Sequence, residues 1–135
     1  MKKFLVSIIA FIILIFTSGC DNQKSYILFN KHPFTPDTMT STTNVFKPGE
    51  RVYYLVTLPK PVETQRLLIQ IFKLGKEDRL GYDIVWGKQV KLRDEQIYYY
   101  TDYVVFNETG GYLMNVYSKD NPTKILTSNQ FYIKQ

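Results

Sequence analysis

The 135-residue chain has one cysteine, one histidine and one tryptophan, and the first two scarcities exclude whole classes of site. Because Cys20 is alone, it can form no disulfide within the chain, so burial of apolar side chains must stabilise the fold. His32 and Cys20 together cannot supply the usual ligand set of a zinc site. His32 lies beside Pro33 in a loop-like stretch, and no serine sits in the glycine-flanked elbow of a hydrolase nucleophile. We therefore predict no metal, no cofactor and no catalytic residues.

The charged residues form no obvious site either. The acidic pairs at 77–78 and 94–95 are flanked by lysine or arginine in predicted turns, where charges keep loops soluble. The alternatives for these pairs are a general acid and base or a calcium loop. The sequence has no phosphate-binding glycine loop and no internal repeat. Its 17 basic and 12 acidic residues are interspersed without a basic block, so we expect no nucleic-acid partner.

The chain also lacks a hydrophobic run long enough to cross a bilayer. An uncharged apolar segment, 4–16, follows Lys2 and Lys3 and precedes the small residues 17–19. A membrane-spanning helix needs about 20 apolar residues, so this segment is too short. The order of a basic start, a short apolar region and small residues is that of a signal peptide for export. We predict that residues 1–19 are removed, which lowers the basic count from 17 to 15 and the net charge to 15 − 12 = +3.

Residues 17–20, Thr-Ser-Gly-Cys, resemble the lipobox of bacterial lipoproteins, whose type II signal peptide places small residues before an obligatory cysteine. Ser18 and Gly19 fit this pattern, whereas Thr17 stands where an aliphatic residue is usual. The resemblance implies that Cys20 becomes the first mature residue and carries fatty acyl chains such as palmitate. It also implies a lipid-anchored protein of the bacterial cell envelope, on the periplasmic or the outer face of a membrane. The alternative is an ordinary secretory signal with a cysteine near its cleavage site by chance.

After a short polar tether, residues 20–24, the remaining chain is long enough for one domain, 25–135. Aromatic and β-branched residues alternate with turn-forming glycine and proline, and no helical stripe is present. This spacing predicts an all-β fold, a single antiparallel β-sandwich of seven to eight strands. The expected strands are 25–29, 51–58, 66–74, 82–86, 88–92, 96–106, 111–118 and 124–134, with Gly87 among the expected turns.

Alternation assigns inner faces to two of these segments. Val52, Tyr54, Val56 and Leu58 share one side of 51–58, and we expect that side to be buried. In 66–74 the corresponding apolar side holds Leu67, Ile69 and Ile71. The segment 96–106 has apolar residues on both sides, so its orientation stays open.

Two motifs resemble immunoglobulin-like domains. Residues 107–117 resemble the corner before strand F, with Glu108, Gly110, Tyr112 and Met114 at the acidic, glycine, tyrosine and cysteine positions. Residues 46–55 are similar to the beginning of strand B in many sandwich domains. The resemblance implies an immunoglobulin-like or fibronectin III-like domain without the bridging disulfide. Independently of it, glycine permits a sharp turn, and the hydroxyl of a buried Tyr112 can bond an upstream backbone group.

Tyrosine is abundant, with eleven residues, three of them consecutive at 98–100. Successive residues of a strand point to opposite faces, so at least one of these three must face outward. We name Tyr98, Tyr100, Tyr103 and Trp86 as a candidate binding surface. The alternative is that tyrosine is here only a good strand former and that Trp86 fills the core.

Three function classes follow. The first is a membrane-anchored, non-catalytic binding or structural module whose partner is another envelope protein or a glycan. The second is an assembly factor of a secretion or surface-appendage system that pairs an edge strand with a client, for which 128–135 is the candidate strand. The third is an enzyme, which would need a pocket where two carboxylates, or His32 and a carboxylate, converge.

Overall fold

The structure is a computed structural model that describes residues 25–58, 66–75, 83–93, 98–119 and 121–135. The predicted signal peptide and tether, with Cys20, lie outside the described residues. Within the described ranges no helix has the length and apolar character needed to span a membrane.

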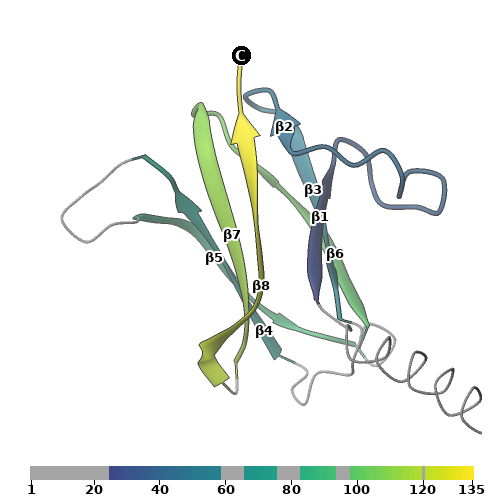
Figure 1. Cartoon of the computed structure of the whole chain (residues 1–135), viewed down its shortest axis with the longest axis vertical. Coiled ribbons are helices and arrows are strands. Elements are labelled where there is room, and N and C mark those ends of the chain that lie inside the picture. Colours follow the sequence, from purple (N-terminus) through teal and green to yellow (C-terminus); the bar gives the residue numbers. More distant parts are fainter. Residues whose placement is uncertain (1–24, 59–65, 76–82, 94–97, 120) are drawn as a thin grey trace, which may run out of the picture.

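The described residues form eight strands in two sheets that pack face to face, so the predicted all-β sandwich is confirmed (Figure 1). The smaller sheet has the order β1-β3-β6 and the larger sheet has the order β2-β8-β7-β4-β5. The strands of the smaller sheet are β1 (Tyr26–Asn30), β3 (Arg51–Thr57) and β6 (Tyr99–Val105). Those of the larger sheet are β2 (Val45–Phe46), β4 (Arg66–Lys73), β5 (Asp83–Lys91), β7 (Gly110–Ser118) and β8 (Asn121–Ile133).

Two expectations about the strands were wrong. The two expected segments, 82–86 and 88–92, are represented by one strand over 83–91, β5, in which Gly87 pairs with Gln70 instead of making a turn. The register shifts by one residue at Ile71/Phe72, and this bulge absorbs Val85 while the strand continues. The short strand β2 was not predicted, and it pairs in parallel with β8, so the sandwich is not antiparallel throughout. A strand of two residues has too few positions to show alternation.

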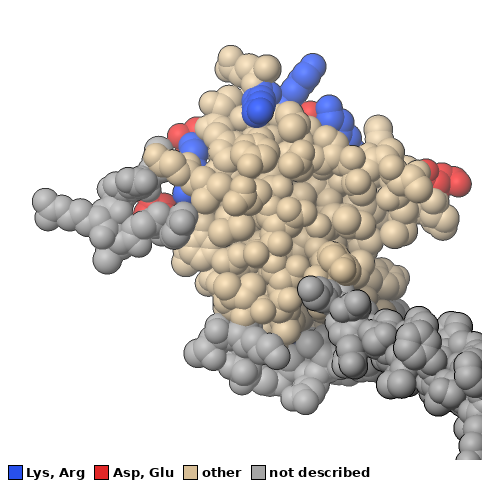
Figure 2. Space-filling view, viewed as in Figure 1, with Lys and Arg blue, Asp and Glu red and all other residues tan. Residues whose placement is uncertain are grey.

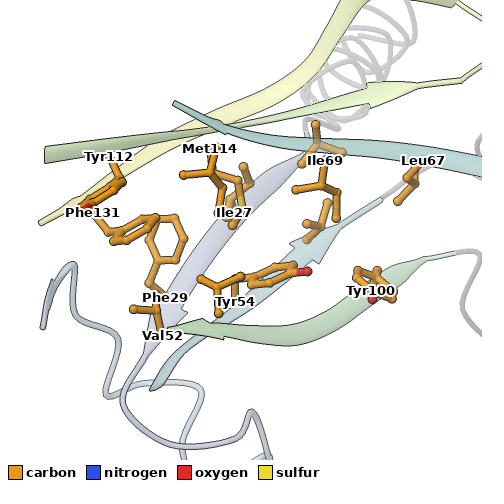
Figure 3. Packing of buried hydrophobic residues seen from close by; sticks show 14 of the residues in the cluster. Ile27, Phe29, Val52, Tyr54, Leu67, Ile69, Tyr100, Tyr112, Met114 and Phe131 are labelled. Atoms are coloured by element: carbon orange, nitrogen blue, oxygen red, sulfur yellow. The ribbon is translucent and has the colours of Figure 1, made fainter. Parts of the chain in front are cut away.

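The core between the sheets holds the side chains that alternation placed inside (Figure 3). Tyr54 on β3 and Ile69 on β4 are completely buried, as is Met114 on β7. The pairing of β3 with β6 decides the orientation that the sequence left open, because Tyr54 lies opposite Asp102 and therefore shares its inner face. Tyr100, Asp102 and Val104 of β6 thus point inward.

The corner before β7 is built around Tyr112, which is 1% exposed. Its ring stacks on both Phe106, at 4.6 Å between centroids, and Phe131, at 5.2 Å. Its hydroxyl donates a hydrogen bond of 2.7 Å to the backbone carbonyl of Glu108. Gly110 has a φ of 145°, and a Cβ there would lie 3.2 Å from Cε of Lys73. The positive φ therefore favours glycine at 110, and a Cβ there would also press on the end of the Lys73 side chain.

The same corner contains a buried ammonium group that the sequence did not indicate. The side chain of Lys73 on β4 is 7% exposed and forms an ion pair with Glu108, whose side chain is 63% exposed. Its Nζ also lies 5.8 Å from the ring centroid of Tyr112. Glu108 thus supplies both its carboxylate and its carbonyl to the corner, which ties the loop before β7 to β4 and β7.

One long side of the sandwich is the seam between β1 and β8. Over these strands, the face seen in Figure 2 shows no Lys, Arg, Asp or Glu at its centre. Asn129 bridges the seam, since its Nδ2 donates to the carbonyl of Ile27 at 2.8 Å and its Oδ1 accepts from the backbone N–H of Gln130 at 2.8 Å. Farther along, β2 pairs with Tyr132 and Ile133. The C-terminal segment 128–135 therefore does not offer a free edge along its whole length.

Candidate binding surface

The outer face of the smaller sheet carries most of its exposed aromatic residues. The pairing registers place its outward residues in rows across β1, β3 and β6. One row, at the end where β1 begins, holds Tyr26, Thr57 and Tyr99. The remaining rows, in order along the sheet, are Leu28, Leu55 and Thr101, then Asn30, Tyr53 and Tyr103, and finally Arg51 and Val105. The two aromatic rows are thus separated by a row of aliphatic and hydroxyl side chains.

The rows farther from the start of β1 form a preorganised cluster, which we call the Tyr–Arg patch: Arg51, Tyr53, Tyr103 and Val105. The ring centroids of Tyr53 and Tyr103 lie 5.5 Å apart, and the guanidinium carbon of Arg51 lies 4.6 Å from the Tyr103 centroid. Arg51 also donates a hydrogen bond of 3.2 Å to the Tyr53 hydroxyl. Tyr103 and Val105 remain 42% and 45% exposed. The patch therefore offers apolar contact area with side chains already held in place.

The electrostatics of the patch are those of a single cation. The hydrogen bond to Tyr53, with smaller effects from the nearby Tyr103 and Tyr53 hydroxyls, raises the pKa of Arg51. Among the described residues no carboxylate forms an ion pair with Arg51. The patch can therefore attract a partner group that accepts hydrogen bonds or carries negative charge.

The structure does not bring the four predicted surface residues together. Tyr103 belongs to the Tyr–Arg patch, whereas Tyr98 is 53% exposed at the opposite end of the same sheet. Tyr100 is only 8% exposed and points into the core, so its assignment to the surface was wrong. Trp86 on β5 is partly buried and packs against the core, as its alternative interpretation held. Tyr53 shares the outer face of β3 with Arg51, and the register places it opposite Tyr103.

On the side of the sandwich away from the seam, a polar cluster joins the two sheets, which we call the β5–β6 latch: Lys88, Tyr100 and Asp102. The Asp102 carboxylate accepts hydrogen bonds from Lys88 Nζ at 2.8 Å, from the Tyr100 hydroxyl at 3.1 Å and from the backbone N–H of Tyr103 at 2.8 Å. Inward-pointing charges on edge strands disfavour the addition of a further strand. The latch therefore makes β5 and β6 poor edges for pairing with a client.

The latch shifts the pKa values of its members. Burial acts to raise the pKa of Asp102, but the hydrogen bonds from Lys88 and Tyr103 and the Lys88 charge outweigh it and lower the pKa. The hydrogen bond to Asp102 raises the pKa of Lys88, although burial opposes it. Burial raises the pKa of Tyr100 and also that of Tyr54 on the neighbouring strand β3. Both phenols therefore stay protonated at neutral pH.

These shifts give a prediction for acid stability. A carboxylate whose pKa is lowered in the folded state stabilises the fold above its unfolded pKa of about 3.9, and this contribution disappears as pH falls through the lower folded pKa. The raised pKa of Lys88 keeps the pair ionised up to about pH 10. Because both side chains are partly exposed, we expect Asp102→Asn to reduce the free energy of unfolding at pH 7 by only about 1 kcal/mol.

Urea unfolding at pH 7 and pH 3 would measure this effect. The difference between parent and Asp102→Asn should shrink on acidification, since the parent then loses the same interaction. Asp83→Asn is the control, because the exposed Asp83 forms no ion pair within the described ranges. A difference between Asp102→Asn and the parent that does not decrease on acidification would contradict the assignment.

The described cavities do not assemble acid–base chemistry. One of about 540 Å³ lies beside the C-terminus and is lined by residues that include Tyr132 and Lys134. Two smaller ones lie at the β1–β8 seam, about 270 Å³, and beside Lys91 and Lys119, about 280 Å³. None of the three is lined by an Asp or Glu side chain or by His32. Among the described residues, no three His, Cys, Asp or Glu side chains are grouped so that they could hold a metal ion.

Comparison with known proteins identifies no family. No protein-family model and no curated protein sequence matches the chain. Two solved structures share part of its shape: the soluble domain of PmoD from Methylocystis sp. and a proposed superoxide reductase from Thermotoga maritima. The first has 13% sequence identity and a TM-score of 0.46, and the match covers 82% of this chain and 90% of that one. The second has 18% identity and a TM-score of 0.43, covering 69% and 82%.

Proposed function

We propose that the protein is a lipid-anchored module of the bacterial cell envelope that binds another envelope protein without catalysing a reaction. The anchor is Cys20, and the binding surface is the Tyr–Arg patch. The observation that carries the binding role is the register that sets Tyr53 beside Tyr103, with Arg51 over the Tyr103 ring. Tyrosine and arginine are among the side chains that dominate protein–protein affinity.

The position of the patch supports this role. From the proposed anchor, the chain enters the domain at Tyr26. The patch lies near the opposite end of the smaller sheet. A surface at the far end of a tethered domain projects away from the bilayer, toward proteins of the surrounding compartment. The edge-pairing alternative is less favoured, because β5 and β6 carry the latch and Asn129 with β2 covers part of the β1–β8 side.

Capture from detergent-solubilised envelopes would test the binding role. We expect Tyr103→Ala to reduce the captured partner about tenfold or more, since truncating a central anchor residue costs about 1.4 kcal/mol or more. Tyr132→Ala is the matched control, because Tyr132 is a partly exposed tyrosine of the other sheet. Equal capture by the two variants would contradict the proposal. Prior protease treatment of the extract should abolish capture, whereas a glycan ligand would survive it.

A further inference from the structure

The two ends of the sandwich differ in their distance from the proposed anchor. β1 begins at Tyr26, which shares a row with Thr57 and Tyr99, so the chain enters the body at the end where β3 finishes and β6 starts. In the larger sheet, Arg66 at the start of β4 pairs with Lys91 at the end of β5. The β7–β8 hairpin turns at this end as well, the lower end of Figure 1. We call it the tether end.

The connection to Cys20 is short compared with the body. From Cys20 to Tyr26 the chain advances six residues, which span at most about 20 Å when fully extended. The nine-residue strand β7, which runs from one end of the sandwich to the other, is about 30 Å long. A lipid on Cys20 therefore keeps the tether end close to the bilayer.

The described residues of the tether end suit the headgroup region of a bilayer. Tyr26, Tyr98 and Tyr99 are 55%, 53% and 45% exposed, and tyrosine is enriched at membrane–water interfaces. The cavity of about 280 Å³ at this end is lined by residues that include Lys91 and Lys119. Lys119 Nζ donates a hydrogen bond of 2.9 Å to Oε1 of Gln89. Because this acceptor is a neutral amide, the bond does not compensate the positive charge of Lys119.

Five of the twelve acidic residues of the chain lie in the described ranges, and none of these five is at the tether end. Asp37, Glu50, Asp83 and Glu108 belong to the opposite end, and Asp102 sits within β6 in the latch. Lysines near an anionic leaflet gain about 1 kcal/mol each, and this attraction falls off within a Debye length.

We propose that the tether end rests on the phospholipid surface, with Tyr26, Tyr98 and Tyr99 in the headgroup layer and Lys91 and Lys119 facing lipid phosphates. This inference rests on the proposed anchor at Cys20. This contact with the lipid surface holds the domain upright on the bilayer, so that the Tyr–Arg patch projects outward.

Lipid quenching of a fluorophore at each end would test the orientation. Ser118→Cys and Thr109→Cys place a thiol at opposite ends of β7, and acylation of Cys20 leaves the new cysteine as the only thiol open to labelling. The labelled full chain is reconstituted into phosphatidylethanolamine–phosphatidylglycerol vesicles that carry a nitroxide on the headgroup. With a separation of about 30 Å, we expect quenching at least about threefold stronger at position 118 than at position 109.

Two further variants test whether the tyrosines of the tether end, and not the patch tyrosine Tyr103, hold that end at the lipid surface. Replacement of Tyr26, Tyr98 and Tyr99 by serine should reduce quenching at position 118, whereas Tyr103→Ser should leave it unchanged. Circular dichroism checks that each variant keeps its β-sheet. If the parent does not float with the vesicles and Cys20 takes up label, the anchor proposal itself fails. If the parent floats but both positions are quenched equally, the anchor stands and the orientation is overturned.

Discussion

Tyr112→Ala is expected to lower the free energy of unfolding by about 3–5 kcal/mol, a large share of the total stability of a domain of this size. The substitution removes a ring that is 1% exposed and that stacks on Phe106 and Phe131 at the corner end of the core. The cavity left behind can close only partly, because strands on both sides hold the neighbouring rings in place.

Tyr112→Phe separates the ring from its hydroxyl. The phenylalanine keeps the stacking but leaves the carbonyl of Glu108 without the 2.7 Å hydrogen bond, so we expect a loss of about 1–1.5 kcal/mol. Tyr132→Phe is the matched control, because its hydroxyl bonds Gln130 on the surface and its loss should have almost no effect. Urea unfolding followed by circular dichroism measures all three. A Tyr112→Phe variant as stable as the parent would show that the corner hydrogen bond is not stabilising.

Cys20→Ser is expected to abolish incorporation of labelled palmitate completely. Serine has no thiol to accept diacylglycerol, and without acyl chains, each buried methylene of which contributes about 0.8 kcal/mol, the processed domain has no lipid anchor. Because the variant can remain unprocessed and be retained by its signal segment, the readouts are the label and the mass of the mature N-terminus. Partition between membrane and soluble fractions is a supporting measurement.

Ser18→Ala is the control for Cys20→Ser. It changes the same segment but keeps a small residue before the cysteine, so the label should persist. Mass spectrometry of the parent should find a chain that begins at Cys20 and carries acyl groups. An unacylated parent, or label retained by Cys20→Ser, would disprove the anchor and with it the proposed location.

The fold was predictable where each residue's environment repeats along a strand. The alternation of Val52, Tyr54 and Val56 fixed the inner face of β3, since a sheet with one buried face leaves a period of two in the sequence. The segment at 96–106 has tyrosines on both sides, so it carries no such contrast, and Tyr100 was misassigned to the surface. The predicted turn at Gly87 was wrong for a related reason, because the sequence does not distinguish a glycine within a strand from a glycine in a turn.

The candidate surface was only half predictable. The many tyrosines near Tyr103 in the sequence predicted that it belongs to a binding surface. Its partners Tyr53 and Arg51, however, lie some fifty residues earlier in the sequence. What joins them is the register between β3 and β6, which pairs Tyr53 with Tyr103. The latch has the same origin, since Lys88 and Asp102 belong to different sheets and meet only when the sheets pack.

The sequence by itself determined the all-β class, the inner faces of the clearest strands and the glycine–tyrosine corner, because these depend on local geometry and on alternation between neighbours. Tertiary structure alone decided which tyrosines are exposed, which charges meet and at which end of the sandwich β1 begins. Those outcomes depend on strand register and sheet packing, and a shift of register by one residue would turn each side chain to the opposite face without altering the local pattern.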